Sequence, residues 1–181
     1  MSSSKHPHGQ IWSERTLPNK VEKKDHQQKE YLTKNNTSLL GDYLQQELAT
    51  KERIIFENDD FVVLIPFWAI WPFEAMIAPK KVQKDILELS GIEAKNYAKA
   101  ISVITSAYDK LFNTSFPYSS GIYQAPTNGE ENAYWHWHMS FYRSLLRSVT
   151  VKKFMAGYEM FGSPQRDITA EIAAKILREL V

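Results

Sequence analysis

Residues 53–78 read RIIFENDDFVVLIPFWAIWPFEAMIA, a stretch dominated by β-branched, aromatic and other apolar side chains. The polar run Asn58-Asp59-Asp60 interrupts it early, and such residues favour tight turns. The residues on either side of this run predict two strands, at 53–57 and 61–67, joined by that turn. This strand–turn–strand unit predicts a sheet at the centre of the domain.

The segment from Phe61 to Ala78 is the most apolar part of the chain and carries a single charge, at Glu74. A membrane helix is one interpretation of such a run. Pro66 and Pro72 oppose it, because proline removes a helical hydrogen bond and clashes with the preceding turn, and the charge opposes it further. We therefore interpret the segment as two buried strands that meet at a proline-defined bend.

Two helices are expected before this stretch. Asn19 is a candidate N-cap, with Glu22 three residues later in capping-box register, for a helix that reaches Lys34. Most of its residues are charged, so we expect it to be lightly packed and to face solvent. Ser38 can cap a second helix, in which four leucines and Tyr43 recur at helical spacing.

Two more helices and two more strands follow. Ser90 and Glu93 form a second capping box, and the apolar side chains after them predict the clearest amphipathic helix of the chain. Residues 117–124 and 134–142 predict strands across a turn-rich segment, and residues 169–180 predict a last helix. The order strands, helix, strands, helix predicts an α+β fold, with a mainly antiparallel sheet and helices packed on one face of it.

The composition is that of a globular domain. The chain has 181 residues, of which 43% are hydrophobic and 24% charged, so disorder over the whole length is excluded. The net charge of +1 gives no basic surplus that would attract nucleic acid or an anionic membrane. The chain contains no cysteine, which removes disulfides, thiolate catalysis and cysteine-held metal sites within it. We expect neither a secretory signal nor a transit peptide, and we expect a cytoplasmic protein.

Four of the five histidines occur as two His-x-His pairs, His6/His8 and His136/His138. In a strand, positions i and i+2 lie on the same face, so each pair is predicted to direct two imidazoles at one site. Metal binding and catalysis by a nucleophilic histidine are the two uses that this spacing allows. The simpler alternative is a pair that only faces solvent or, for the second pair, lies behind a buried aromatic face.

The residues around the first pair make it the more specific of the two. Pro7 fixes the backbone and removes a strand hydrogen bond, as expected of a rigid edge or terminal strand. Gly9 permits close approach of a ligand. Gln10 adds a neutral amide that could hydrogen-bond a phosphate oxygen without neutralising the leaving charge.

A second polar segment, at residues 147–160, surrounds Gly157 with two lysines, a tyrosine and a glutamate. A sugar is recognised by such a mixture of donors and acceptors beside an aromatic surface. An ordinary edge strand with solvated charges is the alternative interpretation of the same residues.

The motifs of the whole chain, taken together, resemble those of the galactose-1-phosphate uridylyltransferase family. The matching segments are His6–Trp12, Ile70–Glu74, Asn113–Ser119, Asn128–Asn132, Leu145–Ser148, Val151–Met160 and Gln165–Glu171. They correspond only to the second half of such an enzyme, which is built from two histidine-triad-like repeats. The resemblance implies a histidine-triad-like α+β fold. Residues 1–18 would form the active-site strand that ends a first repeat, and residues 19–181 the second, carboxyl-terminal domain.

The resemblance also implies a reaction in galactose metabolism. A nucleotidyltransferase of this family passes the uridylyl group of UDP-glucose to galactose 1-phosphate through a uridylyl-histidine intermediate. His8 matches the nucleophile that attacks the α-phosphorus, and Gln10 matches the group that holds the transferred phosphoryl. The amino-terminal half of the enzyme would have to be supplied from outside this chain.

Further residues match the family's substrate contacts. Met1, Ser2 and Ser3 match a loop that touches substrate phosphate. The residues that match hexose and phosphate contacts are Lys153, Phe154, Tyr158, Glu159 and Gln165. In the family these last side chains reach into the neighbouring subunit's site, so the resemblance implies a homodimer.

Neither of the family's two metals finds a complete ligand set in this sequence. His6 matches a zinc ligand, and the other zinc ligands would lie in the amino-terminal half. Some members hold a second metal, assigned to iron, through a glutamate and three histidines. The matching positions here are Lys24, Tyr123, His138 and Ser140, so we predict that the iron is absent. His136 matches no ligand of the family.

Three functions remain open at this point. The first is the carboxyl-terminal part of a uridylyltransferase, active only together with a first half. The second is a non-catalytic nucleotide-sugar-binding or interaction module that kept the fold. The third is transfer of another nucleotidyl group, such as that of an ADP sugar, which the hexose-contact residues disfavour.

Overall fold

The computed structural model describes residues 15–111, 113, 118–143 and 168–181. Its elements, in chain order, are α1 (Asn19–Asn35), α2 (Leu39–Thr50), β1 (Ile54–Glu57), β2 (Phe61–Leu64), β3 (Ala75–Pro79), the 3-10 turn η1 (Ile86–Glu88), α3 (Gly91–Leu111), β4 (Tyr118–Tyr123), β5 (His138–Arg143) and α5 (Ala170–Arg178). The strands form one sheet in the order β1-β2-β3-β5-β4, and each neighbouring pair is antiparallel. The predicted α+β class with an antiparallel sheet is confirmed.

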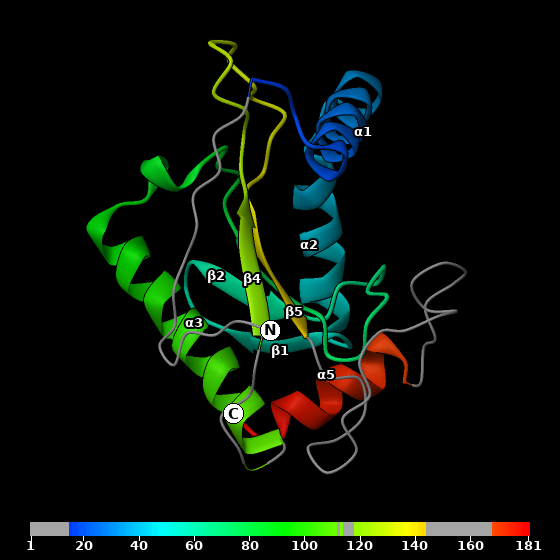
Figure 1. Cartoon of the computed structure of the whole chain (residues 1–181), viewed down its shortest axis with the longest axis vertical. Coiled ribbons are helices and arrows are strands. Elements are labelled where there is room, and N and C mark those ends of the chain that lie inside the picture. The colour runs from blue at the N-terminus through cyan, green and yellow to red at the C-terminus, as the bar shows by residue number, and fades with distance from the viewer. Residues whose placement is uncertain (1–14, 112, 114–117, 144–167) are drawn as a thin grey trace.

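Helices cover both faces of the sheet, whereas the sequence pattern predicted them on one face. In Figure 1, α3 lies on one side of the strands and α2 on the other. The reason lies in β2 and β3, in which every residue is buried. Phe61 and Val63 pack with α3 and α5, whereas Val62 and Leu64 pack with α2. Strands that are apolar on both faces need cover on both sides.

The apolar stretch folds as predicted, with a shorter second strand. Asn58 fixes the turn between β1 and β2, because its side-chain oxygen accepts hydrogen bonds from the backbone N–H groups of Asp60 and Phe61, at 3.1 and 2.8 Å. β2 ends at Leu64, before Pro66, and the chain then bends until β3 begins at Ala75. Among the described residues, none of the helices combines the length and the apolar character that crossing a bilayer requires.

The predicted helix starts hold at two of three places. In the capping box before α3, the N–H of Ser90 donates to the Glu93 carboxylate at 2.7 Å, and the N–H of Glu93 donates to the Ser90 hydroxyl at 3.2 Å. The Ser38 hydroxyl caps α2 by accepting from the N–H of Gly41 at 3.2 Å. The Asn19 N-cap was wrong: Pro18 is the extended residue before α1, and Asn19 is already helical.

The last predicted strand was too long at its start. Residues 134–137 form no strand, because the backbone N–H groups of Trp135 and Trp137 donate elsewhere, to the carbonyls of Asn132 at 3.0 Å and Gln83 at 2.9 Å. β5 therefore begins at His138 and pairs with β3 on one side and β4 on the other.

A buried ion pair joins the end of α2 to the start of β1. The Arg53 guanidinium lies 2.7 Å from the carboxylate of Glu47, whose side chain is fully buried, and 2.8 Å from the carboxylate of Glu171 on α5. Because Glu47 has lost its contact with water, its charge depends on Arg53 for compensation. Breaking a buried pair by removing one partner leaves an uncompensated charge in the interior.

An Arg53→Met variant is expected to lower the free energy of unfolding by about 3 kcal/mol. Urea denaturation followed by circular dichroism measures this loss. Lys51→Met is the matched control, because Lys51 pairs with Glu57 at the surface, where its side chain is 62% exposed. The control should change stability by less than about 1 kcal/mol. Equal losses in the two variants would contradict the compensating role of Arg53.

Candidate functional site

The residues that the resemblance assigns to catalysis, substrate contact and zinc lie outside the described part of the chain. They are Met1, Ser2, Ser3, His6, His8, Gln10, Lys153, Phe154, Tyr158, Glu159 and Gln165. The predicted strand at 6–12 and the polar segment at 147–160 also lie outside it, so their roles stay predictions. The described residues do include the four positions that match the family's second metal.

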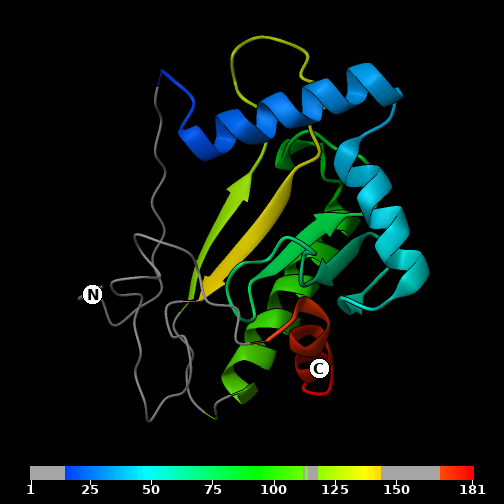
Figure 2. The same cartoon turned by 90° about the vertical axis from the view of Figure 1, so that its right-hand side faces the viewer.

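Those four positions converge at one end of the β4–β5 pair. In the antiparallel register, Tyr123 on β4 lies opposite His138 on β5, and Gly121 lies opposite Ser140. Alternate residues of a strand share a face, so Tyr123, His138 and Ser140 lie on the same side of the sheet. Lys24 approaches that side from α1, and Figure 2 shows α1 lying across this end of the two strands.

The Lys24 ammonium is the centre of this cluster. Its nitrogen lies 2.7 Å from Nε2 of His138 and 4.2 Å from the centroid of the Tyr123 ring. The Tyr123 ring stacks on the His138 imidazole, with centroids 5.3 Å apart and planes 24° from parallel. The cation therefore contacts a lone pair and an aromatic face at the same time, and both contacts favour its charged form.

The second histidine pair does not direct two imidazoles at one site, in contrast to the prediction. His136 precedes β5, and its Nε2 lies 2.8 Å from the carbonyl oxygen of Pro79. His138, the first residue of β5, turns its Nε2 to Lys24. Because β5 begins at His138, four residues later than predicted, His136 lies outside the strand and the i, i+2 rule does not apply to the pair. The His136 side chain is fully buried.

The hydrogen bonds of His138 set its tautomer. Nδ1 lies 3.3 Å from the carbonyl oxygen of His136, which can only accept, so Nδ1 carries the proton. Nε2 is left with its lone pair, which accepts from the Lys24 ammonium. Burial and, to a smaller extent, the charge of Lys24 lower the pKa of His138 to about 3. The imidazole is neutral at ordinary pH.

A buried carboxylate balances the charge of Lys24. Burial lowers the pKa of Lys24 to about 8, and attraction to Glu74 opposes that fall. Glu74 is 8% exposed, and its carboxylate accepts from the N–H groups of Ile70 and Trp71 at 3.1 and 3.3 Å, so it also holds the bend before β3. Residues 70–74, one of the segments that match the family, thus use two backbone N–H groups to hold the carboxylate that attracts Lys24.

α1 is lightly packed, as predicted, with Gln28 as its one buried residue, but polar side chains that the prediction did not include anchor it. Asp25 accepts from the hydroxyl of Tyr134 at 2.8 Å and from Nε1 of Trp135 at 2.6 Å. Gln28 is buried, and its side-chain oxygen accepts from the N–H of His136 at 3.0 Å. These polar side chains carry no apolar signal, so the hydrophobic pattern missed them. Lys24 and Gln28 are four residues apart, and this spacing predicts that they lie on the same face of the helix.

The cluster does not fit the family's second metal. Of the four matching positions, only His138 keeps an imidazole, and the lone pair that would bind a metal already faces the ammonium. No group of three or more His, Cys, Asp or Glu side chains that could hold a metal ion occurs among the described residues. Lys24 adds a positive charge where a cation would bind, which opposes a divalent ion.

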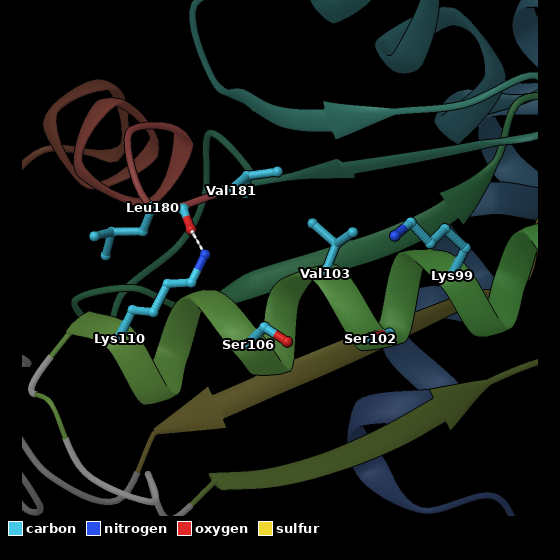
Figure 3. Close-up of a pocket in the computed structure, with 7 residues that line it drawn as sticks. All are labelled: Lys99, Ser102, Val103, Ser106, Lys110, Leu180 and Val181. Carbon is cyan, nitrogen blue, oxygen red and sulfur yellow. Dashed lines mark hydrogen bonds between the residues drawn. The ribbon is translucent and has the colours of Figure 1, made fainter.

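A separate cavity of about 180 Å³ lies on the outer side of α3. Figure 3 shows its lining by Lys99, Ser102 and Ser106 of α3 and by the last two residues, with the Lys110 ammonium donating to the carbonyl oxygen of Leu180 at 2.6 Å. None of its lining residues belongs to the matching segments. It is therefore not a candidate for the site that those segments build.

Comparison with known protein families and known proteins shows which of them this chain is similar to. The family model "Galactose-1-phosphate uridyl transferase, C-terminal domain" matches residues 23–181. The chain is 52% identical to a galactose-1-phosphate uridylyltransferase of Haemophilus influenzae, covering 98% of this chain and 51% of that protein. It is 47% identical to the enzyme of that name from Schizosaccharomyces pombe, covering 98% and 49%. The chain thus spans about half the length of the curated relatives it matches.

Solved structures agree with this relationship. A uridylyltransferase mutant superposes with a TM-score of 0.81 at 26% identity, over 91% of this chain and 54% of that one. A HIT-like protein of Bartonella henselae superposes with a TM-score of 0.52 at 17% identity, over 81% of this chain and 98% of that one, a likeness of fold alone. The histidine-triad-like fold is confirmed. By the extent of the family match, the chain belongs to the galactose-1-phosphate uridyl transferase family, within its carboxyl-terminal domain.

Proposed function

We propose that this chain is the carboxyl-terminal part of a galactose-1-phosphate uridylyltransferase and supplies the nucleophile of the reaction. The observation that carries the proposal is the 52% identity to a curated enzyme of that name over 98% of this chain. Residues 1–18 would complete the active site of a first repeat, and residues 19–181 would form the second domain. The substrates would be UDP-glucose and galactose 1-phosphate.

The proposed reaction runs in two balanced steps at His8. An imidazole nitrogen of His8 attacks the α-phosphorus of UDP-glucose, a nitrogen–phosphorus bond forms, and glucose 1-phosphate leaves with the electrons of the broken phosphoanhydride bond. A phosphate oxygen of galactose 1-phosphate then attacks the same phosphorus, which releases UDP-galactose and restores the imidazole. Gln10 would hydrogen-bond the transferred phosphoryl group, and its neutral amide leaves the charge of the leaving group unchanged.

The remaining contacts of the proposal divide between the two ends of the chain. Met1, Ser2 and Ser3 would contact substrate phosphate. The residues proposed for the hexose and its phosphate are Lys153, Phe154, Tyr158, Glu159 and Gln165. Because these would reach the site of a second subunit, we propose a homodimer, in the cytoplasm.

The proposed zinc site is incomplete within this chain. A structural zinc site uses four ligands, and His6 supplies one of them. The others would come from the amino-terminal half. Zinc bound there would fix the backbone next to His8.

The same fold without turnover is the alternative, a nucleotide-sugar-binding or interaction module. It is favoured by the cluster around Lys24, which departs from the family's metal ligands at three of four positions. The two proposals differ in whether nucleotide is transferred, and one assay separates them.

The test is exchange of label between UDP-glucose and galactose 1-phosphate. Three proteins are compared: the isolated chain, a fusion of this chain behind the amino-terminal half of the Haemophilus influenzae relative, and that relative intact as the positive control. We expect UDP-galactose from the fusion and the intact relative. A folded fusion that binds UDP-glucose without forming UDP-galactose would overturn the uridylyltransferase proposal and support the binding module.

A further inference from the structure

We propose that the Lys24 ammonium acts as a built-in cation that fastens α1 to the β4–β5 end of the sheet, so that this contact needs no bound metal ion. The proposal concerns the fold of the described domain and does not depend on the reaction that the complete enzyme performs.

The first support is the geometry around the ammonium. Its nitrogen lies 2.7 Å from Nε2 of His138 and 4.2 Å from the centroid of the Tyr123 ring. The two partners come from adjacent strands and the cation from a helix that is 114 residues away from His138 in sequence. One positive group therefore joins three elements, which is what a structural metal ion does.

The second support is the state of His138. Its Nδ1–H donates to the carbonyl oxygen of His136, so the lone pair of Nε2 points to Lys24. This lone pair is the group with which a histidine binds a metal. Here the Lys24 ammonium donates to this lone pair, which is then not available to a metal ion. The neighbouring Ser140 has a hydroxyl, which is a weak metal ligand.

The third support is the charge balance. The buried Glu74 carboxylate attracts Lys24, while Lys20 repels it. Glu74 in turn attracts both ammonium groups, so two positive charges face one negative charge. A divalent ion added at this point would meet a positive charge already in place, so metal and Lys24 exclude each other.

The fourth support is the need of α1 for polar anchors. Gln28 is its one buried residue, and Asp25 and Gln28 make the neighbouring contacts to residues 134–136. With so little apolar surface buried, α1 depends on such contacts to stay docked. Loss of the Lys24 contact would also leave the buried Nε2 of His138 without its donor.

The test is hydrogen–deuterium exchange of the full chain, read separately for α1 and α3 by mass spectrometry. In Lys24→Met we expect α1 to exchange about ten- to a hundredfold faster, since a buried acceptor loses its partner, and α3 to change much less. Lys23→Met is the matched control, because Lys23 is exposed on the same helix, and it should leave exchange in α1 unchanged.

The wild-type chain supplies the metal arm of the test. Exchange in α1 should be the same in EDTA and in added Fe²⁺ or Zn²⁺. An ion that binds elsewhere and stabilises the whole domain would slow exchange in α3 as well as in α1, so α3 is the reference. The proposal is overturned if chelation speeds exchange in α1, or if Lys24→Met leaves α1 as protected as Lys23→Met does. If Lys24→Met does not fold, the chelation result decides by itself.

Discussion

A His8→Asn change in the fusion with the amino-terminal half is expected to lower the rate of uridylyl transfer by about 10⁴-fold or more. Asparagine keeps a polar side chain of similar reach but has no nitrogen lone pair that can form a stable bond to phosphorus. The covalent route is then closed, and a route without the intermediate lacks the positioning that the nucleophile provides. The measurement is the initial rate of UDP-galactose formation at saturating UDP-glucose.

A second histidine provides the control for this change. His26 lies on α1, and its side chain is largely exposed. Within the described part of the chain, its one ion pair is with Glu30, at 3.7 Å. His26→Asn should keep the rate of the unmodified fusion. The nucleophile assignment is wrong if His8→Asn retains more than about a tenth of the rate, or if both variants lose it equally.

A Trp137→Ala change is expected to lower the free energy of unfolding by about 4 kcal/mol. Trp137 is fully buried, and its ring centroid lies 5.2 Å from that of Tyr97 on α3 and 5.9 Å from that of Phe61 on β2. The change removes these contacts and leaves a cavity between the sheet and α3, which the surrounding backbone can close only in part. Urea denaturation with linear extrapolation gives the loss.

Trp68 is the matched tryptophan at the surface. It is 46% exposed, and its main aromatic contact is Tyr43, with centroids 4.6 Å apart. Trp68→Ala should cost about 1 kcal/mol, because much of its ring already faces water. A loss at position 137 no larger than the loss at position 68 would show that the core between sheet and α3 is not the main source of stability.

Local signals account for the parts of the fold that the sequence predicted. The Ser90/Glu93 capping box and the Ser38 cap depend on residues three positions apart, and both form as expected. The bend before β3 follows from Pro66, which cannot donate to a strand ladder. These features need no knowledge of distant partners, so one sequence is enough to predict them.

Long-range polar contacts account for what the sequence did not predict. Asp25 binds Tyr134 and Trp135, which are more than one hundred residues away, and nothing in the helical pattern of α1 indicates this. His136 leaves the strand because the next residue, Trp137, donates its N–H to Gln83, a partner that no local rule identifies. The resemblance to a family grouped Lys24 with His138 before the structure was known. The direct contact between the Lys24 ammonium and Nε2 of His138 could be seen only in the structure.

The location of the transferred nucleotide tests the proposed role of this chain most directly. The fusion is incubated with UDP-glucose labelled in the uridine, denatured at alkaline pH to preserve a phosphorus–nitrogen bond, and digested for peptide mapping. We predict one labelled peptide, with the uridylyl group on His8 and lost on brief acid treatment. Label on another residue, or turnover of UDP-glucose with no label on the protein, would contradict a nucleophile supplied by this chain.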